Sequence, residues 1–153
     1  MFLTLVVPVF LPVFTAVALA ALSGESFLLL VDLPSLALVP ILPTLMVMLI
    51  FGLATTRKCF SAPFAPQPSR GDLETSLAFF SALGKAYFLF GVIALSTGMI
   101  YVLKSLQRPE LVGPNLAVAL VSLFYAGLFS AILVLPFQAH ARKRLAGMQD
   151  KNL

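Results

Sequence analysis

Polar side chains inside the last two apolar stretches of this chain are the groups that could bind an ion or bridge helices. They are Ser96, Thr97, Asn115, Ser122, Tyr125 and Ser130. In lipid, such hydroxyl and amide groups commonly hydrogen-bond to their own helix or to a neighbouring helix. We therefore expect a structural role first for each of them, with ion binding as the alternative.

Ionisable groups are missing from the deep middle of these two stretches, which contain no Asp, Glu, Lys or Arg there. A proton path through a membrane usually uses such a group. If protons cross here, the titrating carboxylate must come from another chain. One cysteine and one histidine, Cys59 and His140, argue against a metal site. No pattern for a nucleophile or a phosphate loop is present, so we expect no enzyme activity and no cofactor.

The composition is that of an integral membrane protein. Hydrophobic residues make up 60% of the chain and charged residues 10%, against about 45–50% and about 25% in soluble domains. The 153 residues leave room for about four spans of roughly 20 residues each. The net charge of +4 comes mostly from residues beside the spans. We interpret it as a topology signal, and we expect a lipid bilayer and no nucleic acid as its partner.

Four apolar blocks predict an all-α membrane protein with one four-helix transmembrane domain over residues 1–153. The predicted spans are about 2–22, 27–54, 77–103 and 111–137, with a cytoplasmic link over 55–76 and a basic cytoplasmic tail over 138–153. Prolines in the first two blocks predict kinked helices. The first block ends in small residues that could pass for a signal-peptide cleavage site. It lacks a basic region before it, so we expect a retained span.

Three polar side chains are candidate helix caps. Asp32 precedes Pro34 and can cap or close the turn into the second span. Ser69 or Asp72 can cap the third span, where Asp72 also suits the positive end of the helix dipole. We therefore expect both helix starts to be stabilised by local hydrogen bonds.

The basic residues predict the orientation. Eight of the ten lie in or near the 55–85 region and in the tail, whereas Lys104 and Arg108 lie on the other side. By the positive-inside rule, the link, the tail and both termini are cytoplasmic. Lys85 can snorkel to the headgroups, or contact a lipid phosphate or a partner. The residues expected at the membrane interface are Arg57, Lys58, Lys85, Arg142, Lys143 and Arg144.

Small residues form regular stripes on the last two spans. The stripes are Gly84, Gly91 and Gly98 at seven-residue spacing, then Gly113 with Ala117 and Gly127 with Ala131 at four-residue spacing. Residues at these spacings share one helix face, and small side chains there let helices approach closely in lipid. We expect helix packing from the glycines alone, and an oligomeric pore enclosed by these faces is the alternative.

The fourth block contains a run of residues that is more specific than the stripes. It reads Arg108-Pro-Glu-Leu-Val-Gly-Pro-Asn-Leu-Ala-Val-Ala-Leu120, then Tyr125, then Leu135-Pro136. This run resembles the MotA/TolQ/ExbB family of ion-driven motor subunits, and its flagellar-stator MotA branch most. The similarity runs without a gap from Gly91 to Pro136. Leu22-Ser-Gly-Glu and Asp32-Leu-Pro-Ser35 also resemble that branch's link between the first two spans.

The resemblance implies a multi-pass protein of the bacterial inner membrane. It implies a ring, expected to be a homopentamer, around two transmembrane helices of a single-span MotB/ExbD/TolR-like partner. In the family, an Asp of that partner carries the ion, and the ring is thought to rotate as a motor around it. The residues expected to face the pore or the partner are Gly91, Ser96, Thr97, Gly98, Pro114, Ala117, Ser122, Tyr125 and Pro136.

The chain departs from the flagellar branch in two ways. Phe88 and Leu95 stand where that branch has a Pro and a Thr, and Ser122-Leu123 stands where it has adjacent Thr residues. Fewer oxygen ligands disfavour sodium and leave protons as the expected ion. The short, Pro-rich 55–76 link also cannot build the branch's large cytoplasmic torque domain. A compact relative that serves another process is therefore expected.

Two other interpretations remain open at this point. Leu95 and Leu123 favour a non-conducting scaffold of the same family. An unrelated small four-span transporter or lipid-interacting protein would share only the packing chemistry. A count of chains in the complex distinguishes the ring from the unrelated protein, and ion flux distinguishes the channel from the scaffold.

Overall fold

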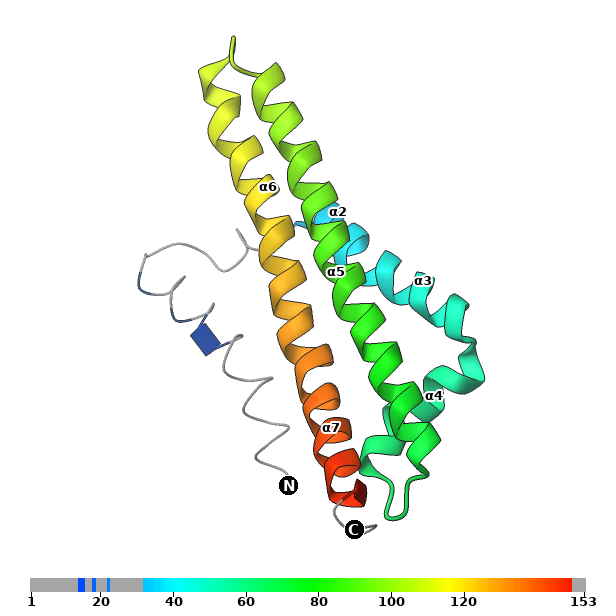
Figure 1. Ribbon diagram of the computed structural model, residues 1–153. Helices are drawn as coiled ribbons and strands as arrows, with labels where there is room; N and C mark the ends of the chain where they lie inside the picture. Colours follow the sequence, from blue (N-terminus) through cyan, green and yellow to red (C-terminus); the bar gives the residue numbers. More distant parts are fainter. Residues whose placement is uncertain (1–13, 16–17, 19–21, 23–31, 150–153) are drawn as a thin grey trace.

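The computed structural model is described at residues 14–15, 18, 22 and 32–149, and the regular elements of this part are all helices (Figure 1). The elements are α2 (Leu33–Leu36), η2 (Ala37–Ile41), α3 (Leu42–Phe51), α4 (Leu53–Ser61), η3 (Ala62–Phe64), α5 (Arg70–Lys104), α6 (Pro109–Phe129), η4 (Ser130–Val134) and α7 (Leu135–Gln149). The described part contains three helical stretches long and apolar enough to cross a membrane, namely Leu33–Phe51, Arg70–Lys104 and Pro109–Gln149. Most of the first predicted span, 2–22, lies outside the described residues.

Prolines shape the second span, as predicted. Asp32 caps α2, and its Oδ2 accepts a hydrogen bond from the Ser35 N–H at 3.0 Å, which confirms the predicted cap. Pro40 lies inside the wide π-helical turn η2. Such a turn accommodates the missing N–H and the bulk of the proline ring. The helix ends at Gly52, whose φ of 81° turns the chain into α4 and lies in a region that favours glycine.

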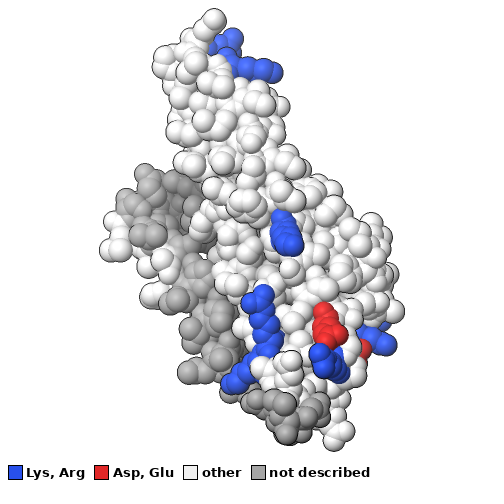
Figure 2. Space-filling view, in the orientation of Figure 1, with Lys and Arg blue, Asp and Glu red and all other residues white. Residues whose placement is uncertain are grey.

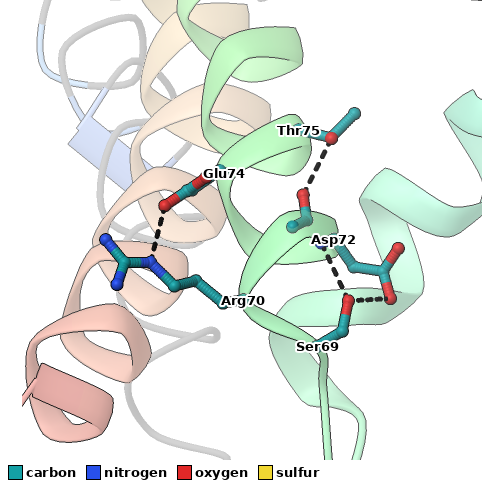
Figure 3. A network of polar contacts seen from close by, with 6 residues as sticks. Ser69, Arg70, Asp72, Glu74 and Thr75 are labelled. Atoms are coloured by element: carbon teal, nitrogen blue, oxygen red, sulfur yellow. Dashed lines mark hydrogen bonds and ion pairs between the residues drawn. The ribbon is translucent and has the colours of Figure 1, made fainter.

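The start of α5 is fixed by the local polar network shown in Figure 3. Ser69 Oγ accepts a hydrogen bond from the Asp72 N–H at 3.1 Å and donates one to Asp72 Oδ2 at 2.7 Å. Arg70 Nε donates to Glu74 Oε1 at 2.9 Å one turn further on. The predicted Ser69 cap is thus confirmed, and α5 begins at Arg70, seven residues before the predicted apolar span 77–103.

The segment 55–76, described above as a Pro-rich link, is mostly helical. Helix α4 and the short η3 cover 53–64, and only 65–69 separates them from α5. Aromatic packing explains the difference. The Phe60 ring packs edge-on against Phe80 with centroids 5.0 Å apart, and Phe80 stacks on Phe137 at 4.7 Å. This cluster holds α4 against α5 and the start of α7.

Helices α5 and α6 form a long antiparallel hairpin, joined by a tight turn after Lys104 (Figure 1). The helix that starts at Pro109 continues through η4 and α7 to Gln149. Pro136 lies at the end of the predicted fourth span, 111–137, and the helix continues past it. The wide turn η4 directly precedes Pro136 and relieves its clash with the preceding turn.

Charged side chains mark the two ends of this hairpin. Figure 2 shows Lys and Arg at the top of the molecule and further charges in its lower half, with an uncharged surface below the top. At the lower end, Arg144 Nη2 donates to the Ala65 carbonyl at 2.7 Å, and His140 stacks on Phe64 at 4.8 Å. Arg144, expected at the membrane interface, thus fastens α7 to the residues after η3.

Candidate functional site

The contact between α5 and α6 is built on glycine. A Cβ placed on Gly91 would lie 2.5 Å from Ala126 Cβ, and one on Gly98 would lie 2.5 Å from Ala119 Cβ. Gly84 faces Val134, whose Cγ1 would be 3.1 Å away. The glycine stripe of α5 therefore packs against the following helix of the same chain, where only a hydrogen fits. Helix packing was the expected role of Gly84.

Ser122 and Tyr125 connect α6 to α2 and to its cap residue Asp32. Ser122 Oγ and Ser35 Oγ are 2.8 Å apart, and both side chains are buried. The Asp32 N–H donates to the Tyr125 phenol oxygen at 3.2 Å. Ser122 and Tyr125 were expected to face the pore or the partner, and the structure brings them together on the buried surface between α6 and α2. Their hydrogen bonds tie the second span to the hairpin.

A further polar contact was not anticipated from the sequence. Thr44 Oγ1 donates to the Pro40 carbonyl at 2.5 Å and lies 2.8 Å from the hydroxyl of Tyr87. Because the Thr44 proton is used by Pro40, Tyr87 is the donor to Thr44. Tyr87 is fully buried. The sequence does contain a signal for the Thr44–Pro40 hydrogen bond. A Thr stands four residues after a proline, and at this spacing on a helix its hydroxyl reaches the proline's carbonyl.

The remaining predicted pore residues fall into two groups. Ser96 and Thr97 are exposed, and each donates back to its own helix, to the Val92 carbonyl at 2.8 Å and the Ile93 carbonyl at 2.9 Å. Pro114 and Ala117 are exposed on α6, whereas Pro136 is buried. The contact of Ser96, Thr97, Pro114 and Ala117 with a pore or partner stays a prediction about the surface that they expose. Pro136 does not lie on an exposed surface of the described chain.

The other small residues of the stripes behave differently from Gly91. A Cβ on Gly113 or Gly127 would meet no atom within 4 Å, and both residues are exposed. Ala131 is half-buried within the π-helical turn η4. Gly113 and Gly127, expected to serve helix packing, thus have no close neighbour among the described residues of this chain.

The comparison with known proteins bears on this same helix pair. The sequence profile of the MotA/TolQ/ExbB proton channel family matches residues 67–151, which contain α5, α6, η4 and α7. The chain belongs to this family. Motility protein A of Aquifex aeolicus (strain VF5) is 26% identical over 104 residues, or 68% of this chain and 41% of that protein. The chain thus spans less than half the length of this relative.

Family membership and the three apolar helices together make the chain a multi-pass membrane protein of a channel family. The matched segment contains the glycine contact of α5 with α6 and the two buried residues Ser122 and Tyr125. The family's sequence profile therefore covers the part of the structure that is most closely packed.

The basic residues of this family member lie mostly on its surface. Arg57, Lys58, Lys85, Arg142 and Lys143 are exposed. Within the described part of the chain, the ion pair found is Arg70 with Glu74, at 2.9 Å. None of the five exposed residues has an acidic partner within salt-bridge distance among the described residues.

An apolar groove of about 320 Å³ opens between the second span and the hairpin. Thr44 and Tyr87 are its polar members, and their hydroxyls are bonded to each other. The lining residues are Leu36, Pro40, Ile41, Thr44, Leu45, Tyr87, Phe129 and Leu133. The groove thus presents an almost entirely hydrocarbon surface to whatever lies outside it.

Proposed function

We propose that this chain is a ring subunit of an ion-driven channel complex of the MotA type. Several copies, five in our proposal, surround two transmembrane helices of a single-span MotB/ExbD/TolR-like partner in the bacterial inner membrane, with both termini in the cytoplasm. The observation that carries the proposal is the family match over 67–151, which coincides with the hairpin α5–α6 and its extension. The complex would act as a compact rotary motor, without the large cytoplasmic torque domain.

The exposed surface of the hairpin is the proposed contact with the partner. Pro114 and Ala117 on α6 are exposed and small, and Ser96 and Thr97 expose hydroxyls on α5. Small residues let a second helix approach closely in lipid. Gly91, Gly98, Ser122 and Tyr125 would support this surface from behind, since their contacts hold α5, α6 and α2 together.

The ion would be carried by the partner. Residues 86–103 of α5 and 111–129 of α6 contain no Asp, Glu, Lys, Arg or His. The hydroxyls of Ser96 and Thr97 donate hydrogen bonds to backbone carbonyls of their own helix. They can therefore only accept a hydrogen bond from a further group. A proton on a partner carboxylate needs few ligands, which favours protons over sodium.

Native mass spectrometry of the complex, extracted gently from its own membrane, tests the ring. Five copies with two copies of a single-span protein that carries a membrane Asp would support the proposal. A monomer or dimer with no such partner would overturn it. Ala117→Leu is the matched variant, because added bulk on this exposed position should remove the partner without unfolding the chain.

A non-conducting scaffold of the same family is the second candidate. Leu123, which stands where the flagellar branch has a Thr, is 38% exposed on α6 and offers no oxygen. Proton flux into liposomes that hold the complete complex separates the two functions. Flux that vanishes when the partner Asp is changed to Asn supports the channel. An intact complex without proton or sodium flux supports the scaffold.

A further inference from the structure

The outer surface of the second span changes from apolar to basic within a few residues. Leu49, Ile50 and Leu53 are 79%, 71% and 65% exposed. Arg57 and Lys58 follow on α4, are exposed, and have no acidic partner within salt-bridge distance among the described residues. Exposed apolar side chains beside uncompensated cations are the pattern expected at the boundary between acyl chains and anionic headgroups.

The acidic residues nearest in the fold are already engaged. Asp72 accepts a hydrogen bond from Ser69, and Glu74 is paired with Arg70. Both lie at the start of α5, next to α4. Among the described residues, Arg57 and Lys58 thus have no acidic partner and are available to a negative group of a ligand.

The height of Arg57 and Lys58 along the bundle follows from their neighbour Cys59. The Ser76 hydroxyl donates to the Cys59 carbonyl at 2.8 Å, and Cys59 packs in one cluster with Phe79 and Phe80. Tyr87, in the apolar groove, is eight residues beyond Phe79 on α5. At 1.5 Å per residue, the groove lies about 12 Å further along the helix axis.

This separation matches one leaflet of a bilayer. The hydrocarbon core is about 30 Å thick, so one leaflet contributes about 15 Å. Helix α5, with 35 residues, is about 52 Å long and extends well beyond the core. Its residues 86–103 are uncharged, whereas Arg70, Asp72, Glu74 and Lys85 all precede them. The groove at Tyr87 thus lies where the uncharged stretch begins, and α4 lies on its charged, headgroup side.

We propose that this surface binds an anionic diacyl phospholipid. Arg57 and Lys58 bind the phosphate, and one acyl chain lies along Leu49 and Leu45 into the groove between Ile41 and Phe129. The hydroxyls of Thr44 and Tyr87 hydrogen-bond to each other, so the groove presents an apolar surface to the acyl chain. The basic residues lie on α4, and the groove lies between the second span and the residues Tyr87, Phe129 and Leu133 of the hairpin and η4. None of these lining residues was proposed to face the partner or the ion.

Lipid retention measured by native mass spectrometry tests the headgroup contact. The purified full chain is exchanged into micelles with phosphatidylglycerol or with phosphatidylcholine of the same acyl chains. We expect phosphatidylglycerol to be retained preferentially. Arg57→Gln with Lys58→Gln should lower that retention about tenfold or more, since each basic residue near an anionic surface contributes about 1 kcal/mol.

Two controls match this double variant. Arg57→Lys with Lys58→Arg keeps the charge and should keep the lipid. Lys104→Gln with Arg108→Gln removes the same charge at the other end of the hairpin and should leave retention unchanged. Equal losses in the two Gln double variants, or equal retention of both lipids, would overturn the proposal.

A third pair of variants tests the groove. Leu45→Trp places a large ring at a lining residue, and Met46→Trp places it at an exposed neighbour that does not line the groove. We expect loss of phosphatidylglycerol only with Leu45→Trp, with unchanged helical circular dichroism in both. Full retention in Leu45→Trp would show that the acyl chain does not use the groove and would overturn the site as proposed.

Discussion

Gly91 of α5 lies directly opposite Ala126 of α6. A Cβ on Gly91 would lie 2.5 Å from Ala126 Cβ, and the next nearest atoms would be 3.8 Å away. The clash is thus with a single methyl group. Two turns further along α5, a Cβ on Gly98 would lie 2.5 Å from Ala119 Cβ and 2.8 Å from Ala119 Cα. Both contacts pair a glycine with an alanine. At Gly91 the obstructing atom belongs to a side chain, whereas at Gly98 a backbone atom obstructs as well.

Exchanging glycine and alanine between the two helices should therefore restore most of the stability at the Gly91–Ala126 contact and only part of it at the Gly98–Ala119 contact. Gly91→Ala should destabilise the hairpin by about 1–3 kcal/mol through overpacking, and Gly91→Ala with Ala126→Gly should recover most of it. Gly98→Ala with Ala119→Gly should recover only part, because the Ala119 backbone still blocks the new Cβ. Denaturant titration in micelles measures the free energies of unfolding. Equal recovery in the two pairs would contradict the assigned atoms.

Ser122→Ala should cost about 0.5–2 kcal/mol of stability, because it leaves the buried Ser35 hydroxyl without its 2.8 Å partner. Ser35→Ala with Ser122→Ala removes both hydroxyls and should cost less than the sum of the single changes. A double-mutant cycle in micelles measures this coupling. Additive losses would mean that the two hydroxyls do not interact.

Ala117→Leu should leave the isolated chain folded and disrupt assembly, because Ala117 is exposed in the single chain but lies on the proposed partner-facing surface. The expected readout is unchanged helical circular dichroism with loss of the oligomer in native mass spectrometry. Val118→Leu, on a 43% exposed neighbour, is the control. Loss of assembly in both variants, or in neither, would argue against this surface.

Arg144→Gln should loosen the segment after η3, because it removes the hydrogen bond from Arg144 to the Ala65 carbonyl at 2.7 Å. We expect limited proteolysis between residues 65 and 69 to become several times faster. Arg142→Gln is the control, since Arg142 is exposed and contacts no residue of that segment by a hydrogen bond in the described part. Equal cleavage rates in the two variants would contradict the role of Arg144.

Cys59 should react slowly with maleimide in the folded chain. Its side chain is 1% exposed, and burial, with a smaller contribution from the charge of Asp72, raises the pKa of its thiol. Since folding raises this pKa, the folded state holds the proton more tightly, and stability should fall as pH rises above the ordinary thiol pKa. Cys59→Ala with Ser61→Cys moves the thiol to an exposed position and should label rapidly. Rapid labelling of native Cys59 would show that α4 does not bury it.

Much of the fold was predictable from local patterns. The apolar stretches predicted the membrane helices, and the described part confirms three candidates. The Asp32 and Ser69 caps were predicted because a short polar side chain before a helix satisfies free N–H groups. The MotA/TolQ/ExbB motif was readable as a continuous run, since it lies within one hairpin, and the family match confirms it.

The helical character of 53–64 could not be read from the sequence. Its prolines and polar residues predict only a polar link between spans. The aromatic rings of Phe60, Phe80 and Phe137, which stabilise the helix found there, come from three different helices. The continuation of the helix past Pro136 also depends on packing. A wide turn can absorb a proline, and only the surrounding packing decides whether the helix continues.

The sequence by itself determined that this is a helical membrane protein of a channel family, because hydrophobic length and a contiguous motif are local properties of the chain. Only the tertiary structure decided which small and polar residues face inward. Gly91, Gly98, Ser122 and Tyr125 contact other helices of the same chain, while Gly113, Ala117 and Gly127 are exposed. Periodicity puts residues on a common face, but the identity of the neighbour on that face depends on how helices distant in sequence pack together.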